Sequence, residues 1–382
     1  MYKDKRIVLH ILEPEPEGEI GGADTHVLNL CIAQKKYSVF FPVVMINQNN
    51  DFYNKLQNNG ITCINLCDLK RKKKDVVKRL RDLPIWSNLE LIHSHQYDAN
   101  YITVLLKIIY RDNWMKIPTI MTCHGWVEIS LQNKIKTFFD FYTYKYADGI
   151  ITTCERDVKR LLARKNAKDK EIITIQNGVK VVTVSNVNKN ELKMKYNLPL
   201  NKIIIAAVGR LASEKRFDVF LHNCKIIYQK RKDVHFVIVG SGSKENDLKK
   251  IAANLGLKQV VTFTGLVEDM QEMYSCIDIL IISSDTETSS RVMLEGMSFK
   301  IPVIATSVGE IPNIIRNWEN GIIVQRRDYE EMSSCALRLL DENNLCYTLG
   351  ENALKTVCDF YTIENMQKRI EAFYLRILKN RK

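Results

Sequence analysis

The chain has 382 residues, of which 46% are hydrophobic and 26% are charged, and its formal net charge is +12. This length exceeds one ordinary core and predicts two domains, and the composition is that of a globular protein rather than a disordered or fibrous one. No apolar stretch is long enough to span a membrane, and the densest basic run lacks the interleaved aromatics that stack on nucleic-acid bases.

The ten cysteines are scattered and form no C-x-x-C pair. This spacing is typical of reduced, mostly buried thiols and favours a cytoplasmic location. The first apolar run is too short for a signal peptide and is followed by acidic residues, which points the same way.

Short apolar runs alternate with helical patterns from the start of the chain. The first strand is expected at 5–12, a Gly-rich loop at 13–26 and a helix at 25–36. Further strands are expected at 41–47, 61–66, 89–95, 118–125, 148–153 and 171–178. Strands that alternate with helices predict a parallel sheet, and strands this uniformly apolar are buried on both faces.

The pattern pauses in a polar, Asn- and Lys-rich stretch, where we place an interdomain linker near 181–198. It restarts with strands at 202–210, 234–243, 259–265, 278–284, 301–307 and 321–325, and the C-terminal tail reads as helical. The sequence therefore predicts an α/β protein with two doubly wound, Rossmann-like domains, at 1–183 and 184–360, that face a cleft. Ligands of such sheets bind outside the carboxyl ends of the strands, so residues directly after each strand are the candidates.

Gly21 and Gly22 follow the first strand and open a helix, so their amides could approach an anion, although a tight turn alone would also explain them. His124 follows a later strand beside Gly125 and could donate a hydrogen bond or handle a proton. His93 is expected to face the sheet interior in a structural role. No third ligand has the spacing of a zinc site, so no metal site is predicted.

In the second half, Arg210 and Lys215 lie between a strand and a helix and suit a diphosphate, the arginine as a planar fork and the lysine as a point charge. Gly240 and Gly242 lie in a flexible loop that could line a nucleotide, and Gly265 follows a strand where open backbone could read a base edge. Each glycine is a weak signal by itself.

Glu287 and Glu295 come after the next strand, one on the loop and one about two turns later on the helix. Carboxylates accept hydrogen bonds from vicinal sugar hydroxyls, so the pair could hold a ribose and a transferred sugar. A metal bound by Asp285 and Glu287 is the less favoured alternative.

Together these residues resemble the GT-B-fold retaining glycosyltransferases of family four, group 1, over nearly the whole chain. The matching motifs are G-G-A-x-x-H at 21–26, T-x-H-G at 122–125, A-D-x-I-I at 147–151, I-x-N-G-V at 175–179, G-R-L-x-x-E-K at 209–215, V-G-x-G at 239–242, F-x-G at 263–265, E-x7-E at 287–295 and P-V-I-A-T-x-V-G at 302–309.

The resemblance implies a role for each candidate. Arg210 and Lys215 would neutralise the diphosphate leaving group, Glu295 would bind the ribose, and Glu287 and His124 would contact the donor sugar. Gly21 and Gly22 would lie near the diphosphate and the acceptor. The remaining donor-binding positions are Gly209, Gly240, Gly242, Gly265, Thr288, Ser289 and Ser290. The last helix, 361–382, is expected to cross back onto the N-terminal domain.

Three positions depart from the family pattern. Arg216 stands where a glycine is common, which predicts a less tight loop, and Lys180 stands where an aspartate is common. The segment 288–290 reads Thr-Ser-Ser in place of a Gly-containing turn, so these hydroxyls are expected to influence donor choice.

The resemblance implies retaining transfer of a sugar from a nucleotide-diphosphate sugar, with UDP favoured, to an acceptor hydroxyl. No metal or other cofactor is required in principle, because Arg210 and Lys215 supply the positive charge. An epimerase or hydrolase on the same fold and a non-catalytic partner subunit are the alternatives.

The acceptor is expected to be a saccharide or a lipid-linked sugar in cell-surface polysaccharide or glycolipid assembly. The basic run 70–74 and the aromatic, basic segment 134–142 suggest contact with the anionic inner face of the cell membrane. A solvated loop and a core-facing helix explain the same residues equally well.

Overall fold

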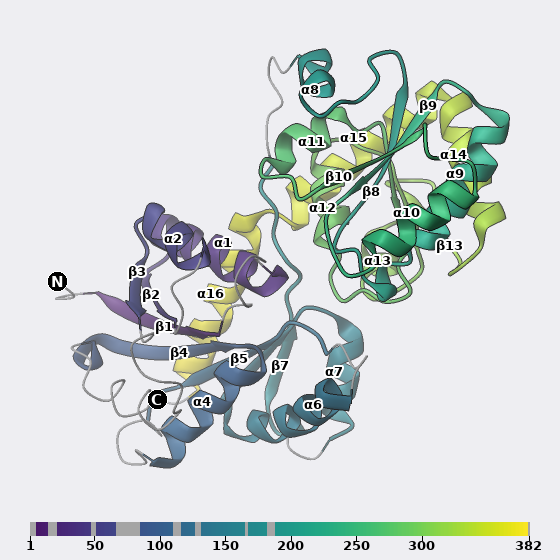
Figure 1. The fold of residues 1–382 in the computed structure, drawn as a ribbon. Coiled ribbons are helices and arrows are strands. Elements are labelled where there is room, and N and C mark those ends of the chain that lie inside the picture. The colour runs from purple at the N-terminus through teal and green to yellow at the C-terminus, as the bar shows by residue number, and fades with distance from the viewer. Residues whose placement is uncertain are drawn as a thin grey trace. The chain divides into compact units, whose positions relative to one another are not determined.

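The computed structural model describes residues 5–13, 21–46, 51–65, 85–109, 116–126, 131–164, 167–181 and 188–380. The basic run 70–74 lies outside these residues. The chain divides into two compact units, Met1–Gly178 with Ile363–Lys382, and Val179–Thr362 (Figure 1).

Within the described residues, the first unit is built on one parallel sheet with strand order β3-β2-β1-β4-β5-β6-β7. Its strands are β1 (Arg6–Leu12), β2 (Phe40–Ile46), β3 (Thr62–Asn65), β4 (Leu89–His95), β5 (Thr119–Cys123), β6 (Gly149–Thr152) and β7 (Glu171–Thr174). Its helices are α1 (Gly22–Tyr37), α2 (Asp51–Asn58), α4 (Gln96–Ile109), α6 (Leu131–Thr143), α7 (Glu155–Leu162) and α16 (Ile363–Lys379), with short 3-10 turns η1 (Trp86–Asn88) and η2 (Tyr144–Tyr146).

The central strands β1 and β4 are almost entirely buried. Their β-branched and leucine side chains have no exposed face, as expected for a parallel sheet that is covered by helices on both sides. In the register of β1 and β4, His10 lies opposite His93 and Leu12 opposite His95. The sheet therefore brings histidines distant in sequence toward its carboxyl edge.

The C-terminal helix α16 belongs to the first unit, where it contacts α1. Phe373, Tyr374 and Ile377 are buried in the same cluster as Val8 of β1. Gly149 at the start of β6 admits this helix closely, because a Cβ added there would lie 2.6 Å from the Phe373 ring. The expected return of the last helix to the N-terminal domain is confirmed.

The second unit is built on a parallel sheet with strand order β10-β9-β8-β11-β12-β13 in the residues described. Its strands are β8 (Ile203–Val208), β9 (Val234–Val239), β10 (Val261–Gly265), β11 (Ile279–Ile282), β12 (Val303–Thr306) and β13 (Ile322–Val324). Its helices are α8 (Lys189–Lys195), α9 (Phe217–Lys230), α10 (Glu245–Asn254), α11 (Met270–Cys276), α12 (Arg291–Ser298), α13 (Ile311–Ile314), α14 (Tyr329–Asp341) and α15 (Asn343–Phe360), with the 3-10 turn η4 (Ser213–Lys215).

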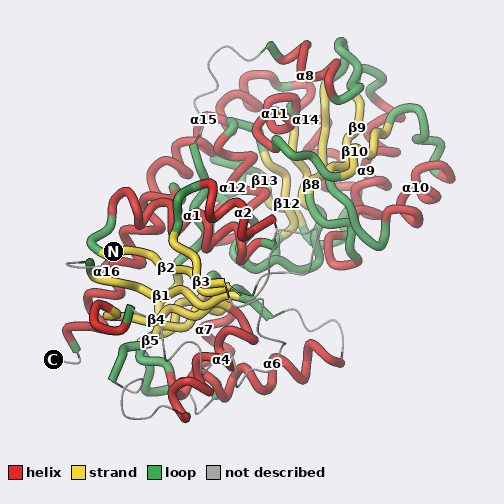
Figure 2. The backbone as a smooth tube through the Cα atoms, turned by 60° about the vertical axis from the view of Figure 1, so that its left-hand side comes forward, coloured by secondary structure: helices red, strands yellow, loops and turns green. Residues whose placement is uncertain are grey.

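In each unit the strands form a central layer with helices around it (Figure 2). The predicted fold class, two parallel α/β sheets of Rossmann type, is therefore confirmed. No helix among the described residues is both long enough and apolar enough to cross a membrane.

Candidate functional site

Lys215 and Glu287 meet at the carboxyl ends of two adjacent strands of the second unit. Lys215 ends the turn η4 after β8, and Glu287 lies in the loop after β11. Nζ of Lys215 lies 2.7 Å from Oε1 of Glu287, and the Ser284 hydroxyl donates to the same oxygen at 2.7 Å. The side chains are 25% and 9% exposed. A cation and a carboxylate therefore stand together in a partly desolvated position, where their interaction is stronger than in water.

Arg210 and Glu295, which the sequence groups with this pair, have other partners in the structure. The Arg210 side chain is 56% exposed and donates to Glu214 at 3.0 Å. Glu295 forms an ion pair with Arg291 and accepts a hydrogen bond of 2.9 Å from the Tyr274 hydroxyl. Burial, and secondarily Glu295, raise the pKa of Tyr274 well above its usual value, so this phenol stays protonated and donates.

The glycines after β8 and β9 let two loops touch through their backbones. Gly209, Gly240 and Gly242 have φ angles of 146°, 125° and 155°. A Cβ added at Gly240 would lie 2.1 Å from the Gly209 carbonyl oxygen, and one at Gly242 would lie 2.5 Å from that of Leu211. Both positions therefore require glycine for conformation and for space. Gly265 also has a positive φ of 69°, but it faces open space.

The segment 288–290 is fixed by the loop that follows β12. The Glu310 amide donates to the Thr288 carbonyl at 3.1 Å, and Gly309 packs so closely that a Cβ there would lie 2.1 Å from the Glu287 carbonyl oxygen. Ser290 is the N-cap residue of α12. The buried Ser289 hydroxyl has no hydrogen-bond partner within the described part of the chain. A buried hydroxyl in that state is a position where a ligand can supply the missing bond.

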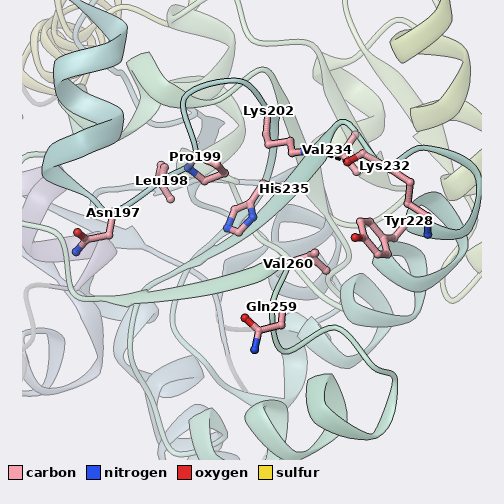
Figure 3. Close-up of a pocket in the computed structure, with 10 residues that line it drawn as sticks. All are labelled: Asn197, Leu198, Pro199, Lys202, Tyr228, Lys232, Val234, His235, Gln259 and Val260. Carbon is pink, nitrogen blue, oxygen red and sulfur yellow. Dashed lines mark hydrogen bonds between the residues drawn. The ribbon is translucent and has the colours of Figure 1, made fainter.

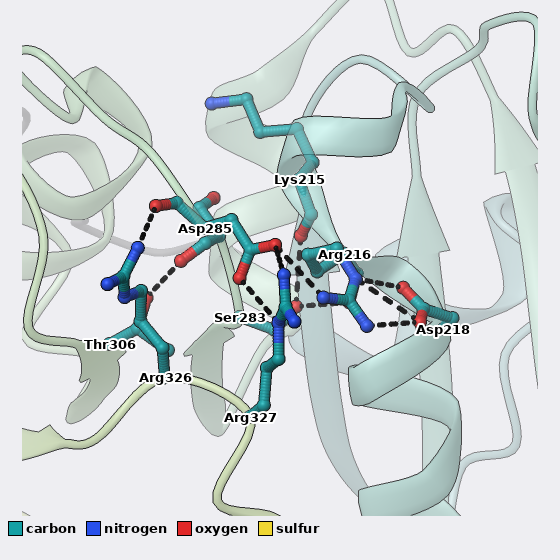
Figure 4. Close-up of polar contacts among 9 residues, drawn as sticks. Lys215, Arg216, Asp218, Ser283, Asp285, Thr306, Arg326 and Arg327 are labelled. Carbon is teal, nitrogen blue, oxygen red and sulfur yellow. Dashed lines mark hydrogen bonds and ion pairs between the residues drawn. The ribbon is translucent and has the colours of Figure 1, made fainter.

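Arg216 joins the loops that carry Lys215 and Glu287 (Figure 4). Its backbone is left-handed, with φ 51° and ψ 46°. Its guanidinium forms ion pairs of 2.7 Å with Asp218 and 2.9 Å with Asp285, and Arg327 contacts Asp285 at 2.7 Å. Arg327 and then Arg216 lower the pKa of Asp285, opposed by its partial burial.

This cluster was not predicted from the sequence, in which Arg216 was expected only to make its loop less tight. The Ser283 hydroxyl also lies 3.1 Å from the Lys215 carbonyl and 2.9 Å from that of Arg216, and the Asp285 amide donates to the Glu214 carbonyl at 2.8 Å. The arginine therefore sits in a tightly bonded connection between β8 and β11. Asp285 carries two arginine partners here rather than standing beside Glu287 as a bare metal ligand.

In the first unit, Gly21 and Gly22 form the start of α1. The Gly21 amide donates to the Asp24 carboxylate at 3.0 Å, and Gly21 is the N-cap of the helix. Within the described part of the chain, a Cβ added at Gly22 would meet no atom within 4 Å. None of the described residues therefore fills the space directly beside Gly22.

His124 directly follows β5 and belongs to a group of packed imidazoles. Its Nε2 lies 3.3 Å from Nδ1 of His95, and its ring lies 4.8 Å from that of His26 in an edge-to-face arrangement. Burial, with a smaller contribution from His26, lowers the pKa of His124 well below its usual value. His93 is fully buried between the Tyr374 and Thr122 hydroxyls, at 2.5 and 2.6 Å, which agrees with the structural role expected for it.

A separate cavity of about 390 Å³ lies at the opposite edge of the second sheet (Figure 3). Its lining includes Lys202, Tyr228, Lys232, His235 and Gln259, which lie at or near the amino ends of β8, β9 and β10. None of the residues that the sequence singled out lines it.

Comparison with known protein families identifies the family to which both units of the chain belong. The profile of the family "Glycosyltransferase Family 4" matches residues 20–182, and that of "Glycosyl transferases group 1" matches residues 188–356. The chain belongs to glycosyltransferase family 4, group 1. It is therefore an enzyme that transfers sugars, and the resemblance seen in its motifs is confirmed.

Relatives of this glycosyltransferase cover much of its length. An uncharacterized glycosyltransferase of Haemophilus influenzae is 25% identical, covering 91% of this chain and 95% of that protein. The capsular polysaccharide biosynthesis glycosyltransferase CapM of Staphylococcus aureus is also 25% identical, and the match covers 74% of this chain and 73% of CapM.

Among solved structures, Anabaena HepE in complex with UDP-glucose superposes on this glycosyltransferase with a TM-score of 0.80. The identity is 16%, and the match covers 97% of this chain and 99% of HepE. The likeness shows that the two share the GT-B fold.

Proposed function

We propose that this glycosyltransferase moves a sugar from a UDP-sugar to an acceptor hydroxyl with retention of anomeric configuration. The observation that carries the proposal is the Lys215–Glu287 pair, because it presents a cation and a sugar-hydroxyl acceptor together at the strand ends. The choice of UDP is supported by the fold shared with HepE, which was solved with UDP-glucose.

The second unit, which we assign as the nucleotide-sugar domain, supplies most of the donor site. Lys215 and Arg210 would face the diphosphate, Glu287 the hydroxyls of the transferred sugar and Glu295 the ribose. The closely packed glycine loops around 209 and 240–242 would offer backbone groups to the phosphates and the nucleoside. Gly265 lies beside them, because its carbonyl accepts a hydrogen bond of 2.9 Å from the Gly240 amide. Three further hydroxyls would lie near the donor, those of Thr288, Ser289 and Ser290. The Ser289 hydroxyl has no hydrogen-bond partner among the described residues and could bond the donor.

In the proposed reaction the anomeric C–O bond to the diphosphate breaks and the acceptor oxygen bonds to the same face of the sugar. Negative charge grows on the leaving diphosphate, which takes the proton of the acceptor hydroxyl. Lys215 and Arg210 would exchange their carboxylate partners, Glu287 and Glu214, for the diphosphate and stabilise that charge. Electrostatic stabilisation of this kind is the largest effect in many enzymes. Glu287 holds the sugar as positive charge develops at the anomeric carbon.

The first unit would bind the acceptor. His124 would hydrogen-bond the transferred sugar, and Gly22, whose added Cβ meets no atom of the described residues, would lie near the diphosphate or the acceptor. Because CapM acts in capsular polysaccharide biosynthesis, we infer an acceptor of the same class, a growing saccharide or its lipid-linked form.

A membrane-bound acceptor is supported by the outer surface of α6. Four large apolar side chains of this helix are 46–62% exposed, namely Ile135, Phe138, Phe139 and Tyr142. Lys134 and Lys136 are exposed on the same helix, although Lys136 also lies 3.6 Å from Asp98. An amphipathic surface of aromatic and basic residues binds the interface of an anionic bilayer. We therefore propose peripheral attachment of this unit to the inner face of the cell membrane.

The experiment that tests the function begins with a thermal-shift screen of UDP-, GDP-, ADP- and dTDP-sugars. A UDP-sugar should raise the melting temperature most, because ligand binding to the native state stabilises it by mass action. That donor is then incubated with saccharide acceptors, and the anomeric configuration of the product is read by NMR. Product of unchanged configuration supports the proposal. Free sugar or an epimerised nucleotide formed without acceptor would instead indicate a hydrolase or epimerase, and an inverted product would refute retention.

A further inference from the structure

Five of the chain's seven histidines gather at one place in the first unit. They are His10, His26, His93, His95 and His124. They come from β1, α1, β4 and the residue after β5. Only His93 and His95 are close together in the sequence, so the cluster cannot be recognised from sequence spacing. Spacing along the sequence, from which no metal site was expected, cannot detect ligands that only the sheet brings together.

The hydrogen bonds of His10 fix the proton positions of His95. Nε2 of His10 lies 2.8 Å from the Gln34 amide oxygen, which only accepts, so this nitrogen carries the proton. In the neutral ring with this proton on Nε2, the lone pair of His10 is on Nδ1. Nε2 of His95, 3.0 Å away, must then donate to it, which leaves the lone pair of neutral His95 on Nδ1.

His26 is oriented in the same way from the other side. Its Nδ1 lies 2.9 Å from the Asn177 side-chain oxygen and donates to it, so the neutral ring carries its lone pair on Nε2. Imidazoles that bind metal ions almost always donate their other ring N–H to a fixed acceptor, which sets the tautomer. His26 and His95 both have this outer support before any ion is present.

We propose that His26, His95 and His124 bind a divalent transition-metal ion of the zinc type. Their ligand atoms lie within 4.8 Å of one another. A tetrahedral zinc ion with Zn–N bonds of 2.0–2.1 Å holds its nitrogens about 3.3 Å apart. His95 Nδ1 and His124 Nε2 lie 3.3 Å apart, close to that edge. With the lone pair of His95 on Nδ1, this contact is a hydrogen bond donated by His124 Nε2, so binding of the ion replaces that bond and requires the His124 proton to move to Nδ1.

The partial exposure of His124 leaves room for a water molecule as fourth ligand, as in other three-histidine sites. The second group of three, His10, His93 and His95, is a poorer site. Both ring nitrogens of His10 and of His93 are already hydrogen-bonded inside the core.

Metal binding here would regulate transfer, a consequence that rests on the proposed function. The ion would take the Nε2 atom of His124 and withdraw this ring from the donor sugar. Zn²⁺ should then inhibit transfer, and a chelator should restore it.

The binding test uses Zn²⁺ alone and the untagged full-length chain. Calorimetry and competition with a chromophoric chelator should show one tightly bound ion, and Co²⁺ should give the visible absorption of a tetrahedral site. His26→Gln and His124→Gln should each weaken binding by more than about tenfold, and Asn177→Leu, which removes the hydrogen-bond acceptor of His26, by about 10- to 100-fold. His222→Gln and His235→Gln, both in the second unit, are the matched controls and should bind as the parent does.

Circular dichroism of each variant separates loss of a metal ligand from loss of the fold. His124→Gln is the variant most able to fold, because His124 is partly exposed. No bound Zn²⁺ in the parent, or equal binding by parent and His124→Gln, would overturn the site and leave the cluster a polar core only. The proposed transfer reaction does not require the ion. Failure of the metal-free enzyme to transfer any sugar would therefore count against the proposed function and not against the metal site.

Discussion

Nζ of Lys215 and Oε1 of Glu287 are 2.7 Å apart, although the two residues are separated by 72 positions in the sequence. The two charges hold each other, and the Ser284 hydroxyl donates a further hydrogen bond to Glu287. In the proposed function a sugar nucleotide would offer a partner to both at once, the diphosphate to the lysine and the sugar hydroxyls to the glutamate. The contact thus keeps both groups in position without leaving either charge unbalanced.

Lys215→Ala and Arg210→Ala should each lower kcat by roughly 100- to 1,000-fold while the protein remains folded, because in the proposed site each removes a cation that stabilises the leaving group. Glu287→Gln should act mainly on the sugar. Steady-state transfer of the donor identified by thermal shift measures the effect. Lys249→Ala is the matched control, since that lysine pairs with Glu245 at the surface of the same unit. Turnover at the parental rate by the Lys215 or Arg210 variant would refute the assigned site.

Two substitutions at Arg216 separate the contribution of its ion pairs to stability from the cost of its left-handed backbone. Arg216→Ala and Arg216→Gly both remove the bonds to Asp218 and Asp285, but only alanine keeps the cost of a left-handed conformation, φ 51°. The alanine variant should therefore be less stable than the glycine variant by about 1–2 kcal/mol in urea denaturation. Both should lose transfer activity as Lys215 and Glu287 lose their shared support. Equal stabilities would show that the left-handed backbone carries no strain.

Two glycines distinguish structural need from ligand access. Gly240→Ala should destabilise the second unit, because its Cβ would lie 2.1 Å from the Gly209 carbonyl oxygen at a φ of 125°. Gly22→Ala should leave the melting temperature unchanged or slightly raised, since that Cβ meets no atom and alanine favours a helix. If transfer nevertheless falls in Gly22→Ala, a substrate passes beside this residue. Full activity in that variant would remove Gly22 from the proposed site.

The first unit should lose stability as the pH falls below neutrality. Burial lowers the pKa of folded His10 from 6.5 to about 4, so between these values the unfolded chain binds more protons than the folded one. The free energy of unfolding therefore decreases as the pH drops through this window, by roughly 3 kcal/mol for His10 alone at pH 4. His93, His95 and His124 shift in the same direction, also chiefly through burial, and should steepen the loss.

Urea denaturation at pH 7.5, 6 and 5 measures this dependence. His222→Gln, which removes an exposed imidazole from the other unit, should leave the dependence of the free energy of unfolding on pH unchanged. A free energy of unfolding that stays constant from pH 7.5 to 5 would contradict the expectation.

Phe139→Ser should weaken binding to vesicles that contain anionic lipid, because the side chain is 62% exposed on the basic, aromatic surface of α6. The matched control is Tyr347→Ser, which removes a 71% exposed aromatic from the second unit. Co-sedimentation with anionic and neutral vesicles, at low and high salt, measures the difference. Equal sedimentation of the two variants, or no binding by the parent at any salt concentration, would exclude α6 as the membrane contact.

The sequence by itself determined the fold class and the set of candidate residues. Apolar runs alternating with helical patterns require parallel sheets with buried strands, and ligands of such sheets approach the carboxyl ends of the strands, so Lys215 and Glu287 could be selected before any contact was known. The motifs around them also identified the family, because their order is preserved along the chain.

Only the tertiary structure decided which side chains are partners. Arg216 looked like a loosening substitution, yet its guanidinium reaches Asp285 across 69 positions and ties two loops together. The histidine group likewise depends on the order in which β1, β4 and β5 lie side by side, which no local spacing encodes. Local patterns follow from the hydrophobic periodicity of neighbouring residues, whereas hydrogen bonds and ion pairs depend on distances of a few ångströms that are set only when separate strands pack into one sheet.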